Sequence, residues 1–298
     1  MGKKKVICEL AGGLGNQMFC YASGMAIAQK YDCDFKIDIS RFANDKFGRK
    51  FELSNFNISA PIINLKRNNL ANKLIRKARI LPYKVITEDD CIFNDIENTR
   101  FDSDKIYLDY NWHQQNHRLF DSIYDDIVDE FAYKNSISSN FSSISEQLEL
   151  FFTVSVHLRY GDYVKIGCCI DPRYYSEAIE KLLSRAKLMN ISKEIAIVVF
   201  SEDTDAAMNI IRNAASNVKI IGIDRSYGLT DIEEFILMKN CDAQVISNST
   251  FSWWAAYLSE KNNSLVAAPT IDGWIKNEWN SSYFPKDWIT IKSELMHR

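Results

Sequence analysis

The stretch that decides the fold is residues 151–163, which read FFTVSVHLRYGDY. Its first part, Phe151 to His157, is rich in aromatic and β-branched residues, as buried strands are. Arg159 and Asp162 follow where this run ends. Ligands of open α/β sheets bind beyond the carboxyl ends of the strands. The stretch therefore predicts a strand that carries polar side chains to the edge of a sheet.

Strand and helix patterns alternate through the rest of the second half. The unbroken apolar run from Ile195 to Phe200 is typical of a buried parallel strand. Ser201 to Thr204 has the composition of a helix start. Repeated β–α units predict a doubly wound parallel sheet. The further strands are expected at Val218–Ile223, Ala243–Ser247 and Leu265–Pro269, and the helices at Arg173–Lys187, Asp231–Lys239 and Ser249–Leu258.

The first half opens in the same way, with a strand at Lys5–Leu10, a glycine-rich turn and a helix at Asn16–Lys30. A second strand is expected at Phe35–Ile39. The serine-rich segment 136–143 is the best candidate for a boundary or surface loop. We therefore expect two α/β lobes that meet near residue 148. Their expected ranges are 1–148 and 149–298.

Composition limits the classes of protein. The chain has 298 residues, of which 46% are hydrophobic and 25% charged, as in ordinary globular proteins. A net charge of -3 argues against nucleic-acid binding as the main task. No apolar run is long enough to predict a transmembrane helix. The seven cysteines are scattered and form no CxxC pair, which favours a reducing cytoplasm and predicts no zinc site.

One segment of the first half is strongly basic. Between Glu52 and Glu88 there is no acidic residue, but seven Lys and Arg residues fall between Lys66 and Lys84. Apolar residues recur among them at helical spacing. The ordinary interpretation is a solvated surface helix packed by its apolar stripe. The alternative is a helix that lies on an anionic membrane surface.

The glycine-rich turn reads Gly12-Gly13-Leu14-Gly15-Asn16-Gln17. Glycines allow a ligand to approach the backbone, and the start of the following helix would attract a phosphate. The spacing matches neither the dinucleotide fingerprint nor the NTPase phosphate loop. A plain tight turn is therefore as good an interpretation as a binding site.

A second polar run, Asn248-Ser249-Thr250-Phe251-Ser252, follows the strand expected at 243–247. Ser249 or Asn248 is expected to cap the next helix. A cap does not account for the remaining hydroxyls, which could complete an anion site at the helix start. Trp253 and Trp254 are expected to pack inside the protein rather than to bind a sugar.

Arg159 is the best single candidate for a ligand-binding residue. A guanidinium can bind phosphate through two charge-assisted hydrogen bonds. The alternative is a surface ion pair with Asp162, which would contribute only about 0–1 kcal/mol. Three polar groups directly after an apolar strand favour the binding site.

Four motifs in this order resemble the motif set of the bacterial α-1,2-fucosyltransferases, glycosyltransferase family 11. They are the turn from Gly12 with Met18-Phe19, His157-Leu158-Arg159 with Gly161-Asp162, Phe200-Ser201-Glu202-Asp203, and Asn248 to Trp254. Tyr107 to Gln114 resembles the family's aromatic segment more loosely. The resemblance runs from about residue 6 to residue 270, and the ordered set is more specific than any one motif.

The resemblance implies a GT-B-like α/β fold, in which two Rossmann-type lobes face a central cleft. The N-terminal lobe would bind the acceptor and the C-terminal lobe GDP-fucose. The transfer would invert the configuration at the anomeric carbon of fucose and need no metal or other cofactor. Arg159 would hold the donor diphosphate, with Asp162 as first and His157 as second candidate for the base. The other implied donor-binding residues are Gly13, Gly15, Asn16, Gln17, Asp203, Asn248, Ser249, Thr250 and Phe251, and the implied acceptor-side residues are Asp109, Tyr110, Trp112 and Gln114.

Two positions depart from the family's pattern. Tyr160 stands where a second arginine is usual, and Cys20 where a glutamine is common. The first change is expected to remove a charge near the diphosphate and to leave more of the phosphate-binding role to Arg159. The triplet Asp203-Thr204-Asp205 could hold a metal in a metal-dependent enzyme, but its position at a helix start matches the family's motif.

The expected activity is transfer of L-fucose to the 2-hydroxyl of a β-galactoside during synthesis of O-antigen or a similar surface glycan. The expected partners are GDP-fucose and a galactose-containing oligosaccharide, with a lipid-linked form as one option. In that case the chain would work at the inner face of the bacterial membrane, in contact with it through Lys66–Lys84. An α-1,6 linkage and a non-catalytic nucleotide-sugar- or glycan-binding protein are the alternatives; the second is suggested by Tyr160.

Overall fold

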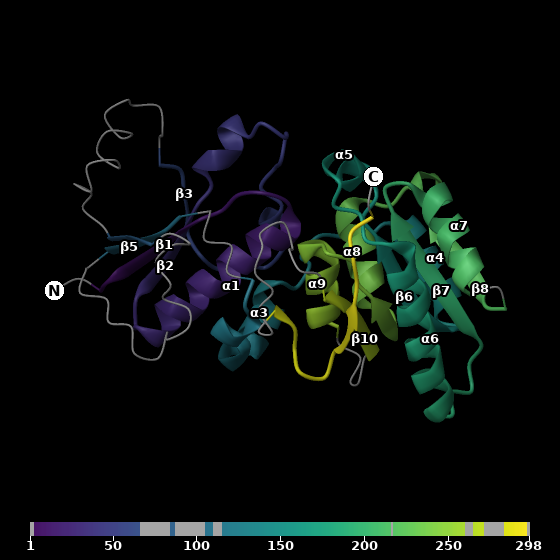
Figure 1. Cartoon of the computed structure of the whole chain (residues 1–298). Coiled ribbons are helices and arrows are strands. Elements are labelled where there is room, and N and C mark those ends of the chain that lie inside the picture. Colours follow the sequence, from purple (N-terminus) through teal and green to yellow (C-terminus); the bar gives the residue numbers. More distant parts are fainter. Residues whose placement is uncertain are drawn as a thin grey trace. The chain divides into compact units, whose positions relative to one another are not determined.

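The chain folds into two compact units, residues 1–135 and 136–298 (Figure 1). The computed structural model describes residues 3–65, 84–86, 105–109, 115–215, 217–259, 265–270 and 283–296. Within this part, each unit is built on one parallel sheet with helices between its strands. The predicted α/β class is confirmed, because every described pair of neighbouring strands is parallel.

The described part of the first unit forms a five-stranded sheet in the order β3-β2-β1-β5-β4. The chain starts in its middle, adds strands on one side and then crosses to the other. The strands are β1 (Lys5–Glu9), β2 (Asp34–Asp38), β3 (Ile62–Ile63), β4 (Lys84–Ile86) and β5 (Lys105–Leu108). The helices and short 3-10 turns are α1 (Leu14–Lys30), η1 (Ser40–Asn44), η2 (Leu53–Asn55), η4 (His117–Leu119), η5 (Asp121–Ile123) and α3 (Tyr124–Glu130).

Helix α1 is buried on most of its surface, because its sequence is apolar nearly all round. Met18, Phe19, Tyr21 and Ala22 are all buried. A surface helix would instead show one apolar stripe. Cys20, which departs from the family's pattern, is also buried within this helix. It therefore packs in the core of the first unit.

The described part of the second unit forms a six-stranded sheet in the order β11-β10-β9-β6-β7-β8. The chain enters at the centre in β6, moves outward through β7 and β8, and returns to β9 on the other side. This is the Rossmann strand order. The strands are β6 (Phe152–Leu158), β7 (Ile195–Ser201), β8 (Lys219–Ile223), β9 (Ala243–Val245), β10 (Leu265–Thr270) and β11 (Ile289–Lys292). The helices and turn are α4 (Ser139–Leu148), α5 (Gly161–Ile166), α6 (Pro172–Leu188), α7 (Thr204–Ala214), η6 (Arg225–Tyr227), α8 (Asp231–Lys239) and α9 (Thr250–Tyr257).

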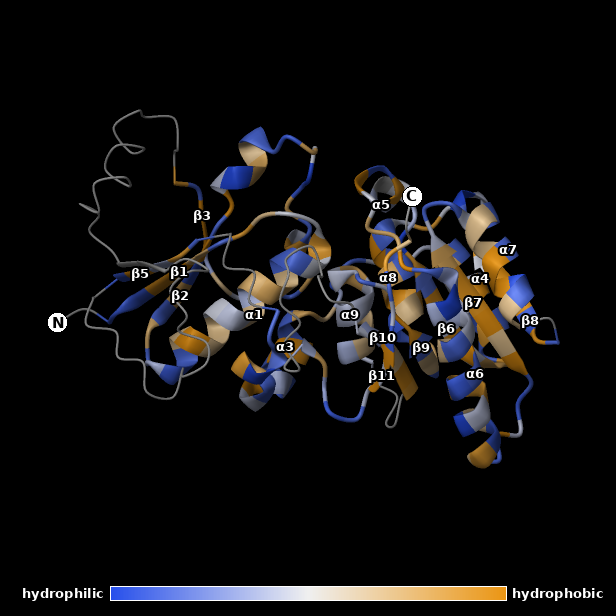
Figure 2. Cartoon of the chain, in the orientation of Figure 1, coloured by the Kyte–Doolittle hydropathy of each residue, from blue (hydrophilic) through white to orange (hydrophobic). Residues whose placement is uncertain are grey.

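The core of the second unit lies between the sheet and its helices. Figure 2 shows β7 as a nearly continuous hydrophobic strand, whereas α6 and α7 alternate between hydrophobic and hydrophilic residues. The buried face of α6 includes Tyr174, Ala178 and Leu182, as their helical spacing predicts. Each large apolar side chain buried in this way stabilises the fold by about 1.5–3 kcal/mol.

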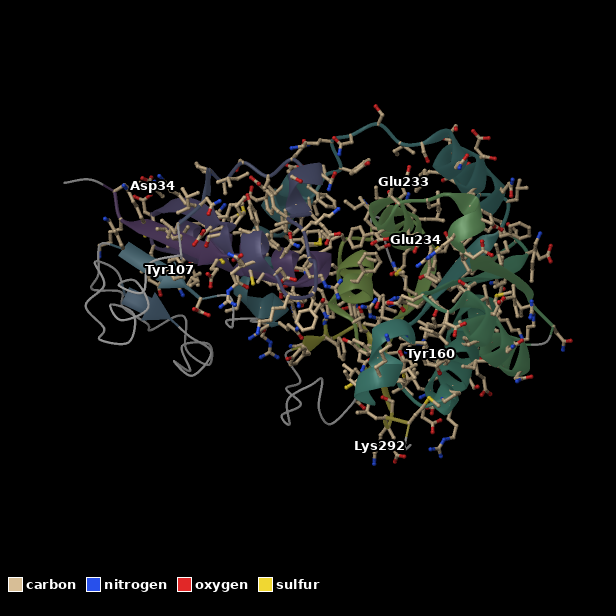
Figure 3. All side chains as sticks on the ribbon, turned by 90° about the horizontal axis from the view of Figure 1, so that it is seen from above. Asp34, Tyr107, Tyr160, Glu233, Glu234 and Lys292 are labelled. Carbon is tan, nitrogen blue, oxygen red and sulfur yellow. The ribbon has the colours of Figure 1, made fainter. Side chains whose placement is uncertain are left out.

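The division between the units falls after Asn135 and not near residue 148. Ser138 caps α4 by accepting a hydrogen bond from the Phe141 N–H at 3.1 Å. The Ser138 N–H in turn donates to Glu233 Oε1 on α8 at 2.8 Å, which ties α4 to the second unit (Figure 3 labels Glu233). The boundary thus falls directly before the serine-rich segment, which the contact with Glu233 joins to the second unit.

Most expected elements are present with ends shifted by a residue or two. Strands β3, β4, β5 and β11 were not predicted, because each is only two to four residues long. Of the basic segment Lys66–Lys84, residues 66–83 lie outside the described part, and Lys84 begins β4. The interpretation of that segment as a helix stays a prediction.

Candidate active site

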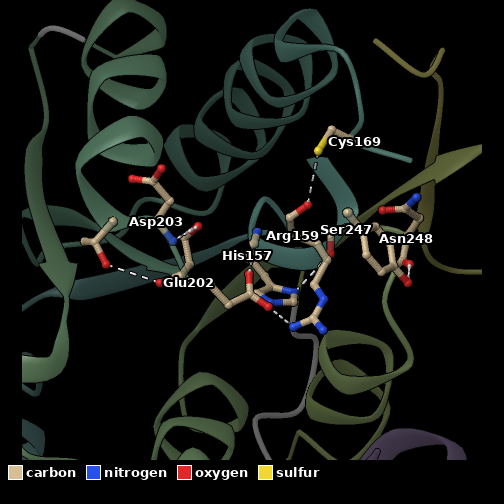
Figure 4. A network of polar contacts seen from close by, with 11 residues as sticks. His157, Arg159, Cys169, Glu202, Asp203, Ser247 and Asn248 are labelled. Carbon is tan, nitrogen blue, oxygen red and sulfur yellow. Dashed lines mark hydrogen bonds and ion pairs between the residues drawn. The ribbon is translucent and has the colours of Figure 1, made fainter. Parts of the chain in front are cut away.

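The candidate site lies at the carboxyl edge of the second sheet, where the strand order reverses. Strands β6 and β7 are in register, with Leu158 opposite Ser201, and β9 lies on the other side of β6. The residues that follow these three strands therefore meet at one place (Figure 4). In this fold the crevice at the reversal is where ligands bind.

His157, near the end of β6, is a buried neutral imidazole. Its exposed fraction is 5%, and its Nδ1 lies 3.0 Å from Ser247 Oγ. The Phe251 ring lies beside it, with the ring centroids 6.0 Å apart. Burial, and then the charge of Arg159, lower the pKa of His157 to about 3. At neutral pH the His157 side chain is therefore uncharged and hydrogen-bonded to Ser247.

Arg159 is held between a carboxylate and an aromatic ring. Its Nη1 forms an ion pair with Glu202 Oε1, and its guanidinium carbon lies 5.3 Å from the centre of the Tyr163 ring. The predicted alternative partner was Asp162, whose backbone lies in α5 and whose side chain is outside the described part. Glu202 was not singled out as a site residue, although it and Arg159 each stand one residue beyond the last registered pair, Leu158 and Ser201.

Gly161 allows Glu202 to come this close. A β-carbon at position 161 would lie 2.9 Å from the Glu202 β-carbon, closer than real atoms approach. The Gly161 N–H also donates to Glu202 Oε2 at 3.4 Å. Glu202 thus contacts the loop after β6 at both Arg159 and Gly161.

Tyr160 points into the core and not into the site (Figure 3). Its exposed fraction is 7%, and it packs in the cluster that contains Tyr174 and Tyr175. Burial, with smaller contributions from Cys169 and Asp171, raises its pKa to about 12. Within the described residues its hydroxyl has no hydrogen-bond partner. The expected loss of a charge near the diphosphate at this position stays a prediction, and the tyrosine itself serves as a core residue.

In the polar run that leads into α9, some side-chain groups make hydrogen bonds within the protein and others do not. Asn248 Nδ2 donates to the Cys168 carbonyl at 2.9 Å, and its backbone carbonyl accepts from the Tyr163 hydroxyl at 3.3 Å. Asn248 Oδ1 is buried and has no partner among the described residues. Ser252 Oγ accepts from the Ser247 N–H at 3.3 Å and donates to the Ser249 carbonyl at the same distance.

The start of α9 differs from its prediction in one respect. Ser249 occupies the cap position, but its side chain makes no capping hydrogen bond. Thr250 is the first helical residue, and Phe251 packs against Phe235 of α8 as well as His157. Trp253 and Trp254 are fully buried, which confirms that they pack inside the protein.

Asp203 has a structural task in this arrangement. It caps α7 by accepting a hydrogen bond from the Ala206 N–H at 3.1 Å. This confirms the predicted helix start. Its expected contact with the nucleotide stays a prediction, since its neighbour Glu202 is the residue that reaches Arg159.

The glycine-rich turn of the first unit is shaped by its own side chains. Gly12 has a φ of +77°, and a β-carbon there would lie 2.9 Å from Asn16 Nδ2. Gly13 precedes α1 at a helix start that no side chain caps, and Gly15 is buried in the first turn. Position 12 therefore requires glycine, both for its left-handed backbone and because a side chain there would clash with Asn16.

Gln17 holds the turn in place, and its side chain is fully used. Its Nε2 donates to the carbonyls of Gly12 and Lys50 at 2.9 and 2.8 Å. Its Oε1 accepts from the N–H groups of Glu52 and Leu53 at 2.9 and 3.4 Å. An amide side chain has two donors and one acceptor oxygen with two lone pairs. This buried side chain therefore supports the turn, and the expected role of Gln17 in donor binding stays a prediction.

Carboxylates line the carboxyl edge of the first sheet. Glu9 pairs with Asp38 in the strand register, and Asp109 follows Leu108, the partner of Cys8. Glu9 and Asp38 are fully buried. Glu9 Oε2 lies 3.3 Å from Arg41 Nε, and the Tyr107 hydroxyl donates to Asp38 Oδ2 at 2.8 Å (Figure 3 labels Tyr107). Sequence reasoning found Asp109 alone; the strand pairing adds the other two.

The remaining acceptor-side candidates, Tyr110, Trp112 and Gln114, lie outside the described residues. Within the described part, no group of three His, Cys, Asp or Glu side chains could hold a metal ion. In that part there is also no helix with the length and apolar character to cross a membrane.

Two α/β units, each built on a parallel sheet with polar residues at the point where its strand order reverses, give a fold of the GT-B-like class. Solved structures support this fold. The α-1,6-fucosyltransferase NodZ from Bradyrhizobium aligns with a TM-score of 0.52 at 14% identity, covering 86% of this chain and 92% of its own. The FUT1 protein of Arabidopsis thaliana, in complex with GDP, aligns with a TM-score of 0.51 at 13% identity, covering 90% of this chain and 70% of its own.

The chain belongs to glycosyl transferase family 11, whose profile matches residues 3–292. An α-1,2-colitosyltransferase of Escherichia coli is 29% identical over 96% of this chain and 99% of its own length. The O-antigen biosynthesis glycosyltransferase WbnK of Escherichia coli is 25% identical over 95% and 99%. The galactoside α-(1,2)-fucosyltransferase 1 of Sus scrofa is 22% identical over 95% and 74%.

Proposed function

We propose that this glycosyltransferase moves L-fucose from GDP-fucose to the 2-hydroxyl of a β-galactoside in the synthesis of O-antigen or a related surface glycan. The observation that carries the proposal is the guanidinium of Arg159 at the reversal point of the second sheet. The names of the relatives support the linkage and the pathway, since they include α-1,2 transferases and an O-antigen enzyme.

The chemistry requires a cation where the donor leaves. The acceptor hydroxyl attacks the anomeric carbon of fucose through an oxocarbenium-like transition state, and GDP departs with additional negative charge. Donors already in place stabilise such a charge without reorganisation. In our proposal Arg159 supplies the charge, and backbone N–H groups at the start of α9 supply further donors, so that no metal is needed.

The base is the less defined part of the mechanism. A general base acts best when its pKa lies near the working pH. His157 is buried and hydrogen-bonded to Ser247, so we assign it the task of holding the loop in place. We propose Asp162 as the group that receives the acceptor proton, as the sequence suggested.

A second candidate is transfer of colitose in place of fucose. The relative with 29% identity over nearly its whole length carries that name. Colitose is the 3-deoxy analogue of L-fucose, so the two donors differ by one hydroxyl. A site with a hydrogen-bond partner for that hydroxyl would reject the deoxy sugar by about 10⁴-fold.

The deciding experiment incubates the full chain with GDP-fucose or GDP-colitose, lactose and EDTA. Release of GDP together with a trisaccharide cut by an α-1,2-specific fucosidase is the expected result. An α-1,6 product, preference for the colitose donor, or binding of GDP-fucose without turnover would each replace the proposal by the corresponding alternative. Activity that appears only when a divalent metal is added would contradict the metal-independent mechanism.

We also propose that the basic segment Lys66–Lys84 brings the enzyme to a membrane that presents a lipid-linked acceptor. Its charge supports this, since about 1 kcal/mol is gained per basic residue near an anionic surface. Neutralising four of these residues should reduce sedimentation with anionic vesicles. Unchanged sedimentation would contradict this part of the proposal alone.

A further inference from the structure

Glu202 presents an unexpected chemistry for a site that binds a diphosphate. A carboxylate paired with Arg159, the cation expected to hold the donor diphosphate, works against an anionic ligand by simple Coulomb repulsion. The ion pair is a direct one and has a side-chain exposure of 23% for Arg159 and 36% for Glu202. Such partly exposed pairs contribute little to stability, so stability alone gives a weak reason for its presence.

The fold builds this contact in a specific way. Arg159 and Glu202 each stand one residue beyond the last pair of β6 and β7, in which Leu158 faces Ser201. Gly161 leaves room for the Glu202 side chain, and its N–H donates to Glu202 Oε2. Glu202 is therefore held at Arg159 by the strand register, by a glycine and by a backbone donor.

We infer that Glu202 is an internal competitor for the phosphate-binding guanidinium: it occupies Arg159 until a nucleoside diphosphate takes its place, and it speeds release of the GDP product. This rests on the proposed function, in which Arg159 binds the donor diphosphate. The phosphate oxygens and the Glu202 carboxylate offer the same acceptor chemistry to the same guanidinium. Each lowers the affinity of the other, because binding coupled in this way is reciprocal.

This role predicts a gain of affinity when the acid is removed, which damage to the fold would not produce. Glu202→Gln keeps the shape and a hydrogen-bonding oxygen but removes the charge. We expect its dissociation constant for GDP, measured by calorimetry on the full chain, to fall about three- to tenfold. The KM for GDP-fucose should fall in the same direction. Glu202→Met, which has a similar shape and no polar atoms, should also bind GDP more tightly.

Two controls isolate the contact. Glu180→Gln on α6 makes the same change in net charge at an exposed position and should leave GDP affinity unchanged. Introducing Glu202→Gln into Arg159→Ala should bring no gain, because the acid acts through that arginine.

Unchanged or weaker GDP binding by both Glu202 variants, at an unchanged melting temperature, would overturn the inference while leaving the proposed function in place. A gain that persists in the Arg159→Ala background would overturn it as well, since the effect would not pass through Arg159. Absence of GDP binding by the wild type would instead overturn the proposed function together with the inference.

Discussion

The two units are both built on a parallel sheet that the chain enters at its centre, but they differ in strand order and in the chemistry at the edges of their sheets. In both, the chain begins at the centre of a parallel sheet and reverses its direction of strand addition. The second unit brings Arg159 and the neutral His157 to that point. The first unit brings Asp109 beside the buried carboxylates Glu9 and Asp38. A guanidinium suits a diphosphate, and carboxylates suit the hydroxyls of a neutral sugar.

The difference teaches that this fold supplies positions, whereas the residues after the strands supply function. The expected division of labour, with the donor bound by the second unit and the acceptor by the first, stays a prediction. The following predictions test that division, starting with the largest effect.

Loss of the cation should have the largest effect. Arg159→Ala should lower kcat by about a hundredfold or more, because one preorganised donor to the transition state contributes about 3 kcal/mol. The rate is measured by GDP release with GDP-fucose and lactose, and the fold by circular dichroism. Arg173→Ala is the matched control, since Arg173 is exposed and pairs with Asp171 away from the site. Normal turnover by folded Arg159→Ala would contradict the assignment of donor binding to the guanidinium edge of the second sheet.

Loss of the buried amide in the first unit should reduce stability. Gln17→Ala leaves two carbonyls and two N–H groups without the partner that they share, and we expect a loss of about 2–3 kcal/mol in the free energy of unfolding. Urea unfolding measures it. The control is Gln29, which lies on the same helix as Gln17 and donates an exposed hydrogen bond to Asp126. Gln29→Ala should reduce the free energy of unfolding by less than about 0.5 kcal/mol. Equal losses in the two variants would show that the turn does not depend on Gln17.

The buried imidazole of the second unit should make the protein sensitive to acid. The pKa of His157 is about 3 in the folded chain and near 6.5 in the unfolded chain, so only the unfolded chain gains a proton as the pH falls below 6.5. The contribution of the neutral His157 side chain to the free energy of unfolding is therefore fully present above pH 6.5 and is lost as the pH falls toward 3.

Between pH 6.5 and 5 the wild type should therefore lose about 2 kcal/mol more than His157→Gln, which does not titrate. Urea unfolding at the two pH values gives the comparison. Parallel losses in both proteins would mean that His157 is charged or solvated at neutral pH.

The carboxylate edge of the first unit should affect the acceptor alone. Asp109→Asn is expected to raise the KM for lactose about tenfold, as loss of one charge-assisted hydrogen bond would, and to leave the KM for GDP-fucose within about twofold. Steady-state kinetics with each substrate varied in turn would show this. A rise in the donor KM of the same size would contradict the assignment of donor and acceptor to different units.

The comparison also shows where sequence reasoning worked. Most strands of the second unit were predicted, because long apolar runs bounded by polar loops leave few other structures open. Arg159 and His157 were found because they follow such a run directly. Asp203 at the start of α7 and the packing of Trp253 and Trp254 were predicted for equally local reasons.

The sequence by itself determined the α/β class, the polar loops after the strands and the family's ordered motifs, since each depends on residues close together in the chain. Only the tertiary structure decided that Glu202 forms an ion pair with Arg159 and that Tyr160 packs in the core. It also decided that the Gln17 amide makes hydrogen bonds to the backbone of residues 50–53. It also set three carboxylates in a row across strands 29 residues and more apart. The physical reason is that strand register and burial fix these partners, and neither is encoded within a single motif.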